Sequence, residues 1–165
     1  MSIFEPSEIF QLAIRIEENG ERFYRRMAEK LDDKKVKELF SALADEEIKH
    51  RLTYEGMVSN IERYEPFESF PGEYFAYLRA YADNHIFTKE KLNEEMESIT
   101  DAASALKFAI DRELDSILYY QEVKKLVPEK QRNVIDKIID EERRHFMKLS
   151  SCKQGIDATC VKKGM

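Results

Sequence analysis

The chain has 165 residues, a length typical of one domain with its own buried core. Charged residues make up 36% of it, and there are only five Gly and four Pro, which favours long solvated helices over loops or disorder. A net charge of −6, with no basic stripe, argues against nucleic-acid binding.

A membrane location is not expected either. No apolar run approaches the roughly 18 residues that a membrane-spanning helix needs. The first residues, Met1 to Glu5, lack the basic start of a signal peptide. We therefore expect a cytoplasmic protein that has no membrane partner.

Apolar residues at helical spacing predict a first helical hairpin near the N-terminus. Its helices are expected over residues 6–31 and 34–63. Asp32 and Asp33 lie between them and supply the turn and an N-cap. A long crossover then follows over residues 64–99.

The crossover is expected to contain two short helices. Pro66 and Pro71 open it, residues 73–83 look like one helix, and Thr88 is the expected N-cap of another. Its aromatic residues are predicted to form the apolar face of the crossover segment, here called the strap. We expect this face to pack either on the bundle or on a second subunit. These residues are Phe67, Phe70, Tyr74, Phe75, Tyr77 and Tyr81.

A second hairpin is predicted after the crossover. Its helices are expected over residues 101–127 and 129–150, with Thr100 or Asp101 as the first N-cap. Two hairpins with short turns, joined by one long crossover, are the ferritin-like way to build a four-helix bundle. The sequence thus predicts an all-α, ferritin-like four-helix bundle over residues 1–150 and a C-terminal tail over residues 151–165.

One pattern of carboxylate, aromatic and imidazole residues occurs twice, once in each hairpin. Each copy has a Glu on the first helix, a Tyr seven residues later, and a Glu-Glu-x-x-His on the second helix. The first copy consists of Glu17, Tyr24, Glu46, Glu47 and His50, and the second of Glu113, Tyr120, Glu141, Glu142 and His145.

Six of these residues interrupt the apolar stripes that should face the core: Glu17, Glu47, His50, Glu113, Glu142 and His145. An unpaired buried carboxylate costs several kcal/mol even after relaxation, and no Lys or Arg lies at the same level. Two divalent cations would balance the four carboxylates. Oxygen and imidazole ligands without thiolate suit iron or manganese and do not exclude zinc. We therefore predict that these six residues bind two iron ions, with manganese or zinc as alternatives.

The neighbours of these six residues leave two alternatives open. Tyr24 and Tyr120 either donate their hydroxyls to ligand carboxylates, as candidates for a catalytic role beside the metal ligands, or only pack in the core. Glu46 and Glu141 either hydrogen-bond a ligating His on an adjacent helix or are exposed charges without a role. His85, alone in the crossover, is expected to be ordinary.

Cys152 and Cys160 are the only cysteines, and both are expected to be free thiols with at most a minor redox role.

Residues 13–24 and 45–50, repeated as 109–120 and 140–145, resemble the di-iron domain of rubrerythrins over about residues 5–150. The resemblance implies a non-haem di-iron centre in a ferritin-like bundle, in a cytoplasmic homodimer that reduces hydrogen peroxide. It also places the six predicted ligands on the ligand positions of the family.

The resemblance has two departures. Rubrerythrins carry a further Glu one turn after the ligand of the third bundle helix, where this chain has Ser116. They usually also carry a rubredoxin module with two Cys-x-x-Cys pairs, which is absent here, so electrons must come from an external donor such as a rubredoxin-like protein. Two functions therefore remain: an oxidoreductase that reduces hydrogen peroxide, or a ferroxidase or iron-binding and storage protein that reacts with dioxygen.

Overall fold

The computed structural model describes residues 6–60 and 72–163, and the side chains of residues 7–60 and 72–157. Within these residues there are six helices and no strand, which confirms the all-α fold. The helices are α1 (Pro6–Lys30), α2 (Lys34–Val58), α3 (Gly72–His85), α4 (Lys89–Ser98), α5 (Ala102–Lys125) and α6 (Glu129–Lys163). None of them combines the length and apolarity that crossing a bilayer requires.

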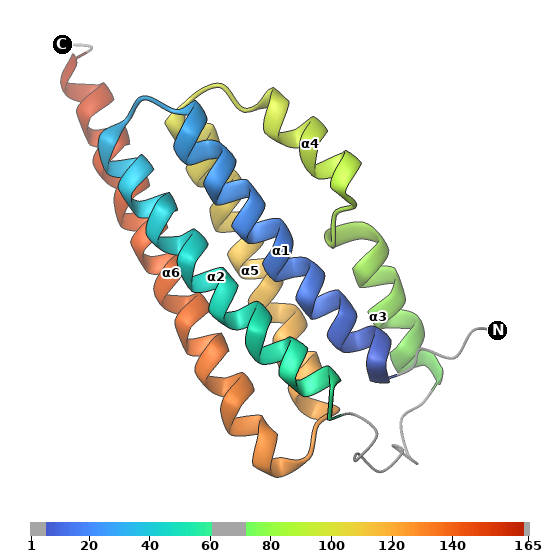
Figure 1. The fold of residues 1–165 in the computed structure, drawn as a ribbon. Helices are drawn as coiled ribbons and strands as arrows, with labels where there is room; N and C mark the ends of the chain where they lie inside the picture. Colours follow the sequence, from blue (N-terminus) through green and yellow to red (C-terminus); the bar gives the residue numbers. More distant parts are fainter. Residues whose placement is uncertain (1–5, 61–71, 164–165) are drawn as a thin grey trace.

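Four long helices form the bundle. Figure 1 shows α1 beside α2 and α5 beside α6, with the short helices α3 and α4 running along the side of α1. The chain rises along α1 and descends along α5, so these two helices are antiparallel. The two hairpins and the long crossover therefore have the predicted arrangement.

Side-chain caps fix the starts of three helices, as the sequence predicts. A carboxylate oxygen of Asp33 accepts from the backbone amide three residues later, at 3.0 Å. The Thr88 hydroxyl does the same at the start of α4, at 3.3 Å, and Asp101 at the start of α5, at 2.9 Å. Each cap satisfies an amide that the first helical turn leaves without a partner.

The end of α2 differs from the prediction. The helix ends at Val58 rather than at Arg63. The side chains of Ser59 and Asn60 both donate to the carbonyl of Gly56, at 2.8 Å, and such local hydrogen bonds compete with continuation of a helix. Residues 61–71 lie outside the described residues, and with them Pro66, Pro71, Phe67 and Phe70.

The end of α6 also differs from the prediction. The helix continues to Lys163 and does not end at Ser150. Its apolar stripe runs on past Leu149, because Cys152 and Ile156 are partly buried and pack against the core. The spacing of these three residues is helical, so the predicted end of the helix at Ser150 was wrong.

The crossover packs on the bundle of its own chain. Tyr81 of α3 is buried, and its hydroxyl donates to the carbonyl of Asp115 on α5, at 2.5 Å. Tyr74 and Phe75 are partly buried against the same core, whereas Tyr77 is exposed. The first of the two packing alternatives for the strap is thus confirmed for α3.

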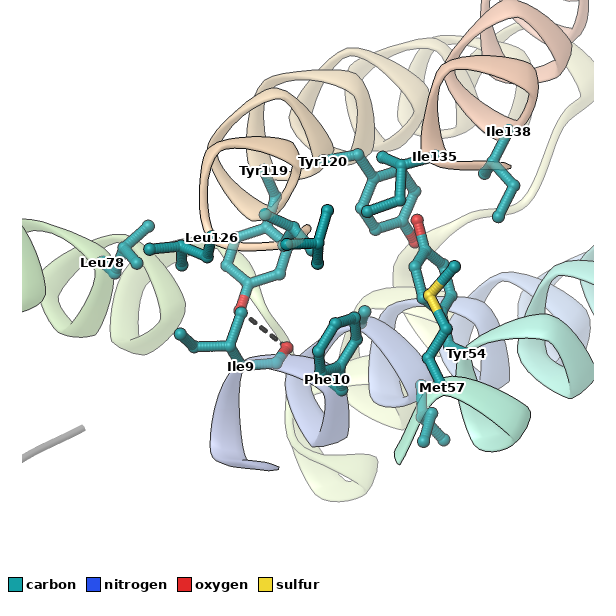
Figure 2. Close-up of a cluster of buried hydrophobic side chains, with 14 of the residues drawn as sticks. Ile9, Phe10, Tyr54, Met57, Leu78, Tyr119, Tyr120, Leu126, Ile135 and Ile138 are labelled. Atoms are coloured by element: carbon teal, nitrogen blue, oxygen red, sulfur yellow. Dashed lines mark hydrogen bonds between the residues drawn. The ribbon is translucent and has the colours of Figure 1, made fainter. Parts of the chain in front are cut away.

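Apolar residues form two core clusters, one toward each end of the bundle. The cluster in Figure 2 joins the start of α1, the ends of α2 and α5 and the start of α6. There the Tyr119 hydroxyl donates to the carbonyl of Ile9, at 3.0 Å. The second cluster contains the opposite ends of the same four helices. The six predicted ligands come between the two clusters along every helix, in the middle of the bundle.

Candidate metal centre

The structure brings the six predicted ligands together. α1 and α5 each contribute one carboxylate, and α2 and α6 each contribute a carboxylate and an imidazole one turn apart. None of the six residues is more than 4% exposed. Such burial excludes the ordinary explanation of charged helical residues, which is a solvated face.

The six side chains form two overlapping groups. One consists of Glu17, Glu47, His50 and Glu142, and the other of Glu47, Glu113, Glu142 and His145. In each group the four donor atoms lie within 4.8 Å of one another. Glu47 and Glu142 belong to both groups, so the two carboxylates of α2 and α6 are placed to bridge two ions.

The donor atoms have the spacing of ligands around an ion. The Nδ1 atom of His145 lies 3.5 Å from Glu47, 3.6 Å from Glu113 and 3.4 Å from Glu142. On the other side, the Nδ1 atom of His50 lies 3.6, 3.8 and 2.8 Å from Glu17, Glu47 and Glu142. Ligands about 2.0–2.2 Å from one ion lie roughly 3–3.5 Å apart, so an ion fits each group.

Unpartnered buried atoms converge on the same place. Within the described part of the chain, five donor atoms of this site are buried without a hydrogen bond of good geometry: Glu17 Oε2, Glu113 Oε2, Glu142 Oε1, His50 Nδ1 and His145 Nδ1. Two of them, His50 Nδ1 and Glu142 Oε1, lie 2.8 Å from each other. A buried polar atom without a partner costs about 1–3 kcal/mol, and more when it is charged. Metal ligation would satisfy all five, so the residues fit a pair of cations.

Protons balance the charge while no metal is bound. Burial raises the pKa of Glu17 and of Glu113 well above its ordinary value, and the charges of neighbouring carboxylates raise it further. Burial alone would lower the pKa of His50 and His145. The surrounding carboxylates outweigh this effect and raise the pKa of both rings. Metal binding must therefore displace protons.

Two tyrosines fix the outer oxygens of two candidate ligands. The Tyr24 hydroxyl on α1 donates to Oε1 of Glu113 on α5, and the Tyr120 hydroxyl on α5 donates to Oε1 of Glu17 on α1. Each bond leaves the other oxygen, Oε2, to face the site. Burial, followed by the nearby carboxylate charge, raises the pKa of Tyr24 and Tyr120, so both hydroxyls remain donors. Both tyrosines therefore donate hydrogen bonds to candidate ligand carboxylates, and their catalytic role stays a prediction.

The carboxylates before the Glu-x-x-His ligands contact the histidines across the bundle. Nε2 of His50 on α2 lies 2.7 Å from Glu141 on α6, and Nε2 of His145 on α6 lies 2.5 Å from Glu46 on α2. Each ring donates from Nε2, which leaves Nδ1 for a metal and raises its basicity. The predicted hydrogen bonds of Glu46 and Glu141 are thus present.

We expect Glu141→Gln and Glu46→Gln to weaken iron binding by about 10–100-fold, the usual effect of removing a carboxylate behind a ligating histidine. The variants keep an acceptor but lose the charge that supports the ring. Competition with a chelator measures the affinity. Glu38→Gln on the exposed face of α2 is the matched control. Affinities equal to that of the control would assign Glu46 and Glu141 no role at the metal.

Tyr54 has a position near the site that was not anticipated from the sequence. It is fully buried, and its ring centroid lies 5.1 Å from that of Tyr120 (Figure 2). Its hydroxyl has no hydrogen-bond partner among the described residues. The corresponding position of the second repeat is Leu149, so the internal repeat offers no signal for this hydroxyl.

Tyr54→Phe should therefore not destabilise the metal-free protein and should stabilise it by up to about 1–3 kcal/mol, because it removes an unsatisfied buried hydroxyl. Tyr119→Phe is the control, since the Tyr119 hydroxyl donates to a backbone carbonyl and its loss should destabilise by about 0.5–1.5 kcal/mol. Urea unfolding compares the two variants. An equal loss of stability in both would show that Tyr54 has a hydrogen-bond partner in solution.

Two other residues that the sequence singled out have ordinary surroundings. His85 is 45% exposed, stacks on Tyr81 and lies 3.5 Å from Asp115. Cys152 is a partly buried free thiol, and burial raises its pKa, which disfavours a reactive thiolate. The side chain of Cys160 lies outside the described residues.

Comparisons with known proteins agree with this geometry. The rubrerythrin family model matches residues 8–153. A crystal structure from Thermotoga maritima, of a candidate ferritin-like diiron-carboxylate protein, superposes with a TM-score of 0.65 and 32% sequence identity, covering 91% of this chain and 95% of that one. A search of curated proteins finds no match. The ferritin-like fold predicted from the sequence is confirmed, and the chain belongs to the rubrerythrin family.

Proposed function

We propose that this protein is a non-haem di-iron oxidoreductase that reduces hydrogen peroxide with electrons from an external donor. The observation that carries the proposal is the sharing of Glu47 and Glu142 between two buried groups of ligands. A shared pair of carboxylates would hold two ions together rather than at separate sites. The family and the similar diiron-carboxylate structure support iron as the metal.

The reaction sets clear requirements. Conversion of one hydrogen peroxide into two waters consumes two electrons and two protons. Two ferrous ions would supply both electrons at one place. The protein must then hold the ligands as their charge changes, limit the access of water, and connect the buried site to a source of protons.

The residues of this chain meet these requirements in three ways. The hydroxyls of Tyr24 and Tyr120 hold the terminal carboxylates of Glu113 and Glu17 in position. The two apolar clusters close the bundle above and below the site. The hydrogen bond between the buried ring of His50 and the 45% exposed side chain of Glu141 links the site to solvent protons.

The choice of oxidant distinguishes this proposal from ferroxidase or storage activity. The protein is loaded with iron, reduced without oxygen, and mixed with hydrogen peroxide or dioxygen in a stopped-flow instrument. We expect the peroxide reaction to be faster, with two irons per chain. Glu38→Ala, on the exposed face of α2, should react like the native protein. A dioxygen rate equal to or above the peroxide rate, with many irons accumulated per chain, would establish ferroxidase and storage instead.

The partners of this reaction remain predictions. A rubredoxin-like protein is the electron donor expected from the resemblance to rubrerythrins. A homodimer is expected from the family resemblance. Oxidation of reduced rubredoxin on mixing with the oxidised protein tests the first prediction. The molar mass measured by light scattering tests the second.

A further inference from the structure

Four tyrosine rings, here called the tyrosine series, connect a candidate metal ligand with the crossover. The series begins at Tyr120, whose hydroxyl donates to Glu17. The ring centroid of Tyr120 lies 6.2 Å from that of Tyr119 on the same helix, and Tyr119 stacks on Tyr81 of α3 at 5.8 Å. The ring of Tyr81 in turn lies 6.5 Å from that of Tyr77. Aromatic rings in contact have centroids about 4.5–7 Å apart, so the series is continuous.

The tyrosine series leads from the middle of the bundle to solvent. Tyr120 and Tyr119 are buried (Figure 2), Tyr81 is 8% exposed, and Tyr77 is 45% exposed. A phenol that loses an electron also releases its proton to a base. The hydroxyls of Tyr119 and Tyr81 donate to backbone carbonyls, which are very weak bases, whereas water reaches Tyr77. An oxidised tyrosine of this series is therefore most stable at the surface end.

The other half of the internal repeat has no such series among the described residues. Tyr24 is the repeat equivalent of Tyr120 and donates to a ligand carboxylate in the same way. Its ring contacts are Phe23, at 5.5 Å, and Phe40, at 5.1 Å, and Phe23 continues to Phe108 at 4.7 Å. A phenyl ring is much harder to oxidise than a phenol. Phenylalanine fills the space beside Tyr24, so packing by itself does not require tyrosines beside Tyr120.

We propose that the tyrosine series carries one oxidising equivalent from the metal pair to Tyr77 when hydrogen peroxide meets a half-reduced site. The inference rests on the proposed two-iron site and adds a second source of electrons to it. Reduction of peroxide takes two electrons, and only one is available where one iron is ferrous and the other ferric. The second electron comes from Tyr77 and moves inward through the rings of Tyr81, Tyr119 and Tyr120.

The step balances in atoms, electrons and charge. One hydrogen peroxide, one ferrous ion, the phenol of Tyr77 and one proton from solution give two waters, one ferric ion and the neutral phenoxyl radical of Tyr77. The O–O bond of peroxide and the O–H bond of Tyr77 break, and the two protons complete the waters. One electron and one proton from the external donor then restore the phenol. The series thus completes the reduction of peroxide and moves the radical away from the metal ligands.

Radical trapping at Tyr77 tests this inference. The iron-loaded protein, reduced without oxygen by one electron per iron pair, is mixed with one equivalent of hydrogen peroxide and a nitroso spin trap. Peptide mass spectrometry then locates the adduct, which we expect on Tyr77. Freeze-quenched samples should show a radical by electron paramagnetic resonance whose signal narrows when the tyrosines are ring-deuterated. In the fully reduced protein both electrons come from iron, so the adduct should be largely absent.

Tyr119→Phe interrupts the tyrosine series and should lower the yield of the Tyr77 adduct at least about tenfold, because a phenyl ring raises the barrier to electron transfer. Tyr54→Phe is the matched control. The ring of Tyr54 is also buried and lies 5.1 Å from that of Tyr120, but its other ring contact is Phe10, so it is not on the path to Tyr77. This variant should give the adduct in the native yield.

The outcomes separate this inference from the proposed function. Equal adduct yields in Tyr119→Phe and Tyr54→Phe would overturn the inference, because a diffusing oxidant reaches the surface without the tyrosine series. Oxidation of the remaining ferrous ion by peroxide without an adduct on Tyr77 would also overturn it and would leave peroxide reduction intact. If Tyr119→Phe does not load iron, Tyr81→Phe is judged by the same comparison. An adduct that depends on Tyr119 supports the inference even where the stopped-flow comparison assigns dioxygen as the faster oxidant.

Discussion

Glu47→Ala should reduce the iron content from about two ions per chain to one or fewer, and Glu142→Ala should do the same. Each of these carboxylates belongs to both groups of donor atoms, so its loss removes a ligand from both metal positions at once. No other carboxylate of the described residues joins both groups. Iron per chain, measured by elemental analysis after anaerobic loading and desalting, gives the result.

The control for this experiment is Glu38→Ala, which removes an exposed carboxylate of α2 and should leave two irons per chain. Glu17→Ala and Glu113→Ala provide a further comparison, because each removes a ligand from one group alone and should weaken one position more than the other. Full loading of both Glu47→Ala and Glu142→Ala would contradict the shared site.

Iron affinity should rise steeply with pH. The metal-free site holds protons on His50, His145, Glu17 and Glu113, since the pKa of each lies above its ordinary value. A ligating ring nitrogen must be neutral and a ligating carboxylate ionised, so binding releases these protons. Below the raised pKa values, the affinity should increase about tenfold per pH unit for each proton displaced.

Chelator competition at pH 6, 7 and 8, together with proton release in weak buffer, measures this linkage. The direction of the pKa shifts fixes the direction of the pH dependence. Groups with a raised pKa hold protons in the metal-free protein, so iron affinity falls at lower pH and rises at higher pH. Glu47→Ala is the control for proton release, because a variant that binds at most one iron per chain should release correspondingly fewer protons when iron is added. An affinity that is independent of pH would show that the metal-free site holds no displaceable protons.

The six-residue site could be predicted from the sequence because burial and charge conflict there. Apolar stripes with a period of 3.6 residues identify the core face of a helix. The negative charge of Glu47 or Glu142 on such a face requires a neutralising positive charge. The internal repeat then indicates which helices form pairs. The repeat also singled out Tyr24 and Tyr120, seven residues after Glu17 and Glu113, but left open whether they donate hydrogen bonds or only pack; the structure shows the hydrogen bonds.

The parts that could not be predicted depend on distances between helices. The sequence left two alternatives open for Glu46 and Glu141, because only the close approach of α2 and α6 makes each a partner of the opposite histidine. The hydrophobic periodicity of one helix does not specify which residues of a neighbouring helix it will contact. The contact between the rings of Tyr81 and Tyr119 likewise depends on how the crossover covers α5.

The helix ends were predicted less well for a related reason. The sequence lacks a strong stop signal after Ser150, and the partly buried Cys152 and Ile156 continue the apolar stripe of α6. At the end of α2, the side chains of Ser59 and Asn60 make local hydrogen bonds to the carbonyl of Gly56, and such bonds are not reported by hydrophobic periodicity.

The most direct test of a two-metal site is anomalous X-ray diffraction at the iron absorption edge, from crystals of the iron-loaded protein. We predict two iron peaks in the middle of the bundle, about 3.5–4 Å apart, as is typical of two-metal sites. One peak should lie beside Nδ1 of His50 and the other beside Nδ1 of His145, with Glu47 and Glu142 in contact with both. A single peak, or iron bound only outside this layer, would contradict the account.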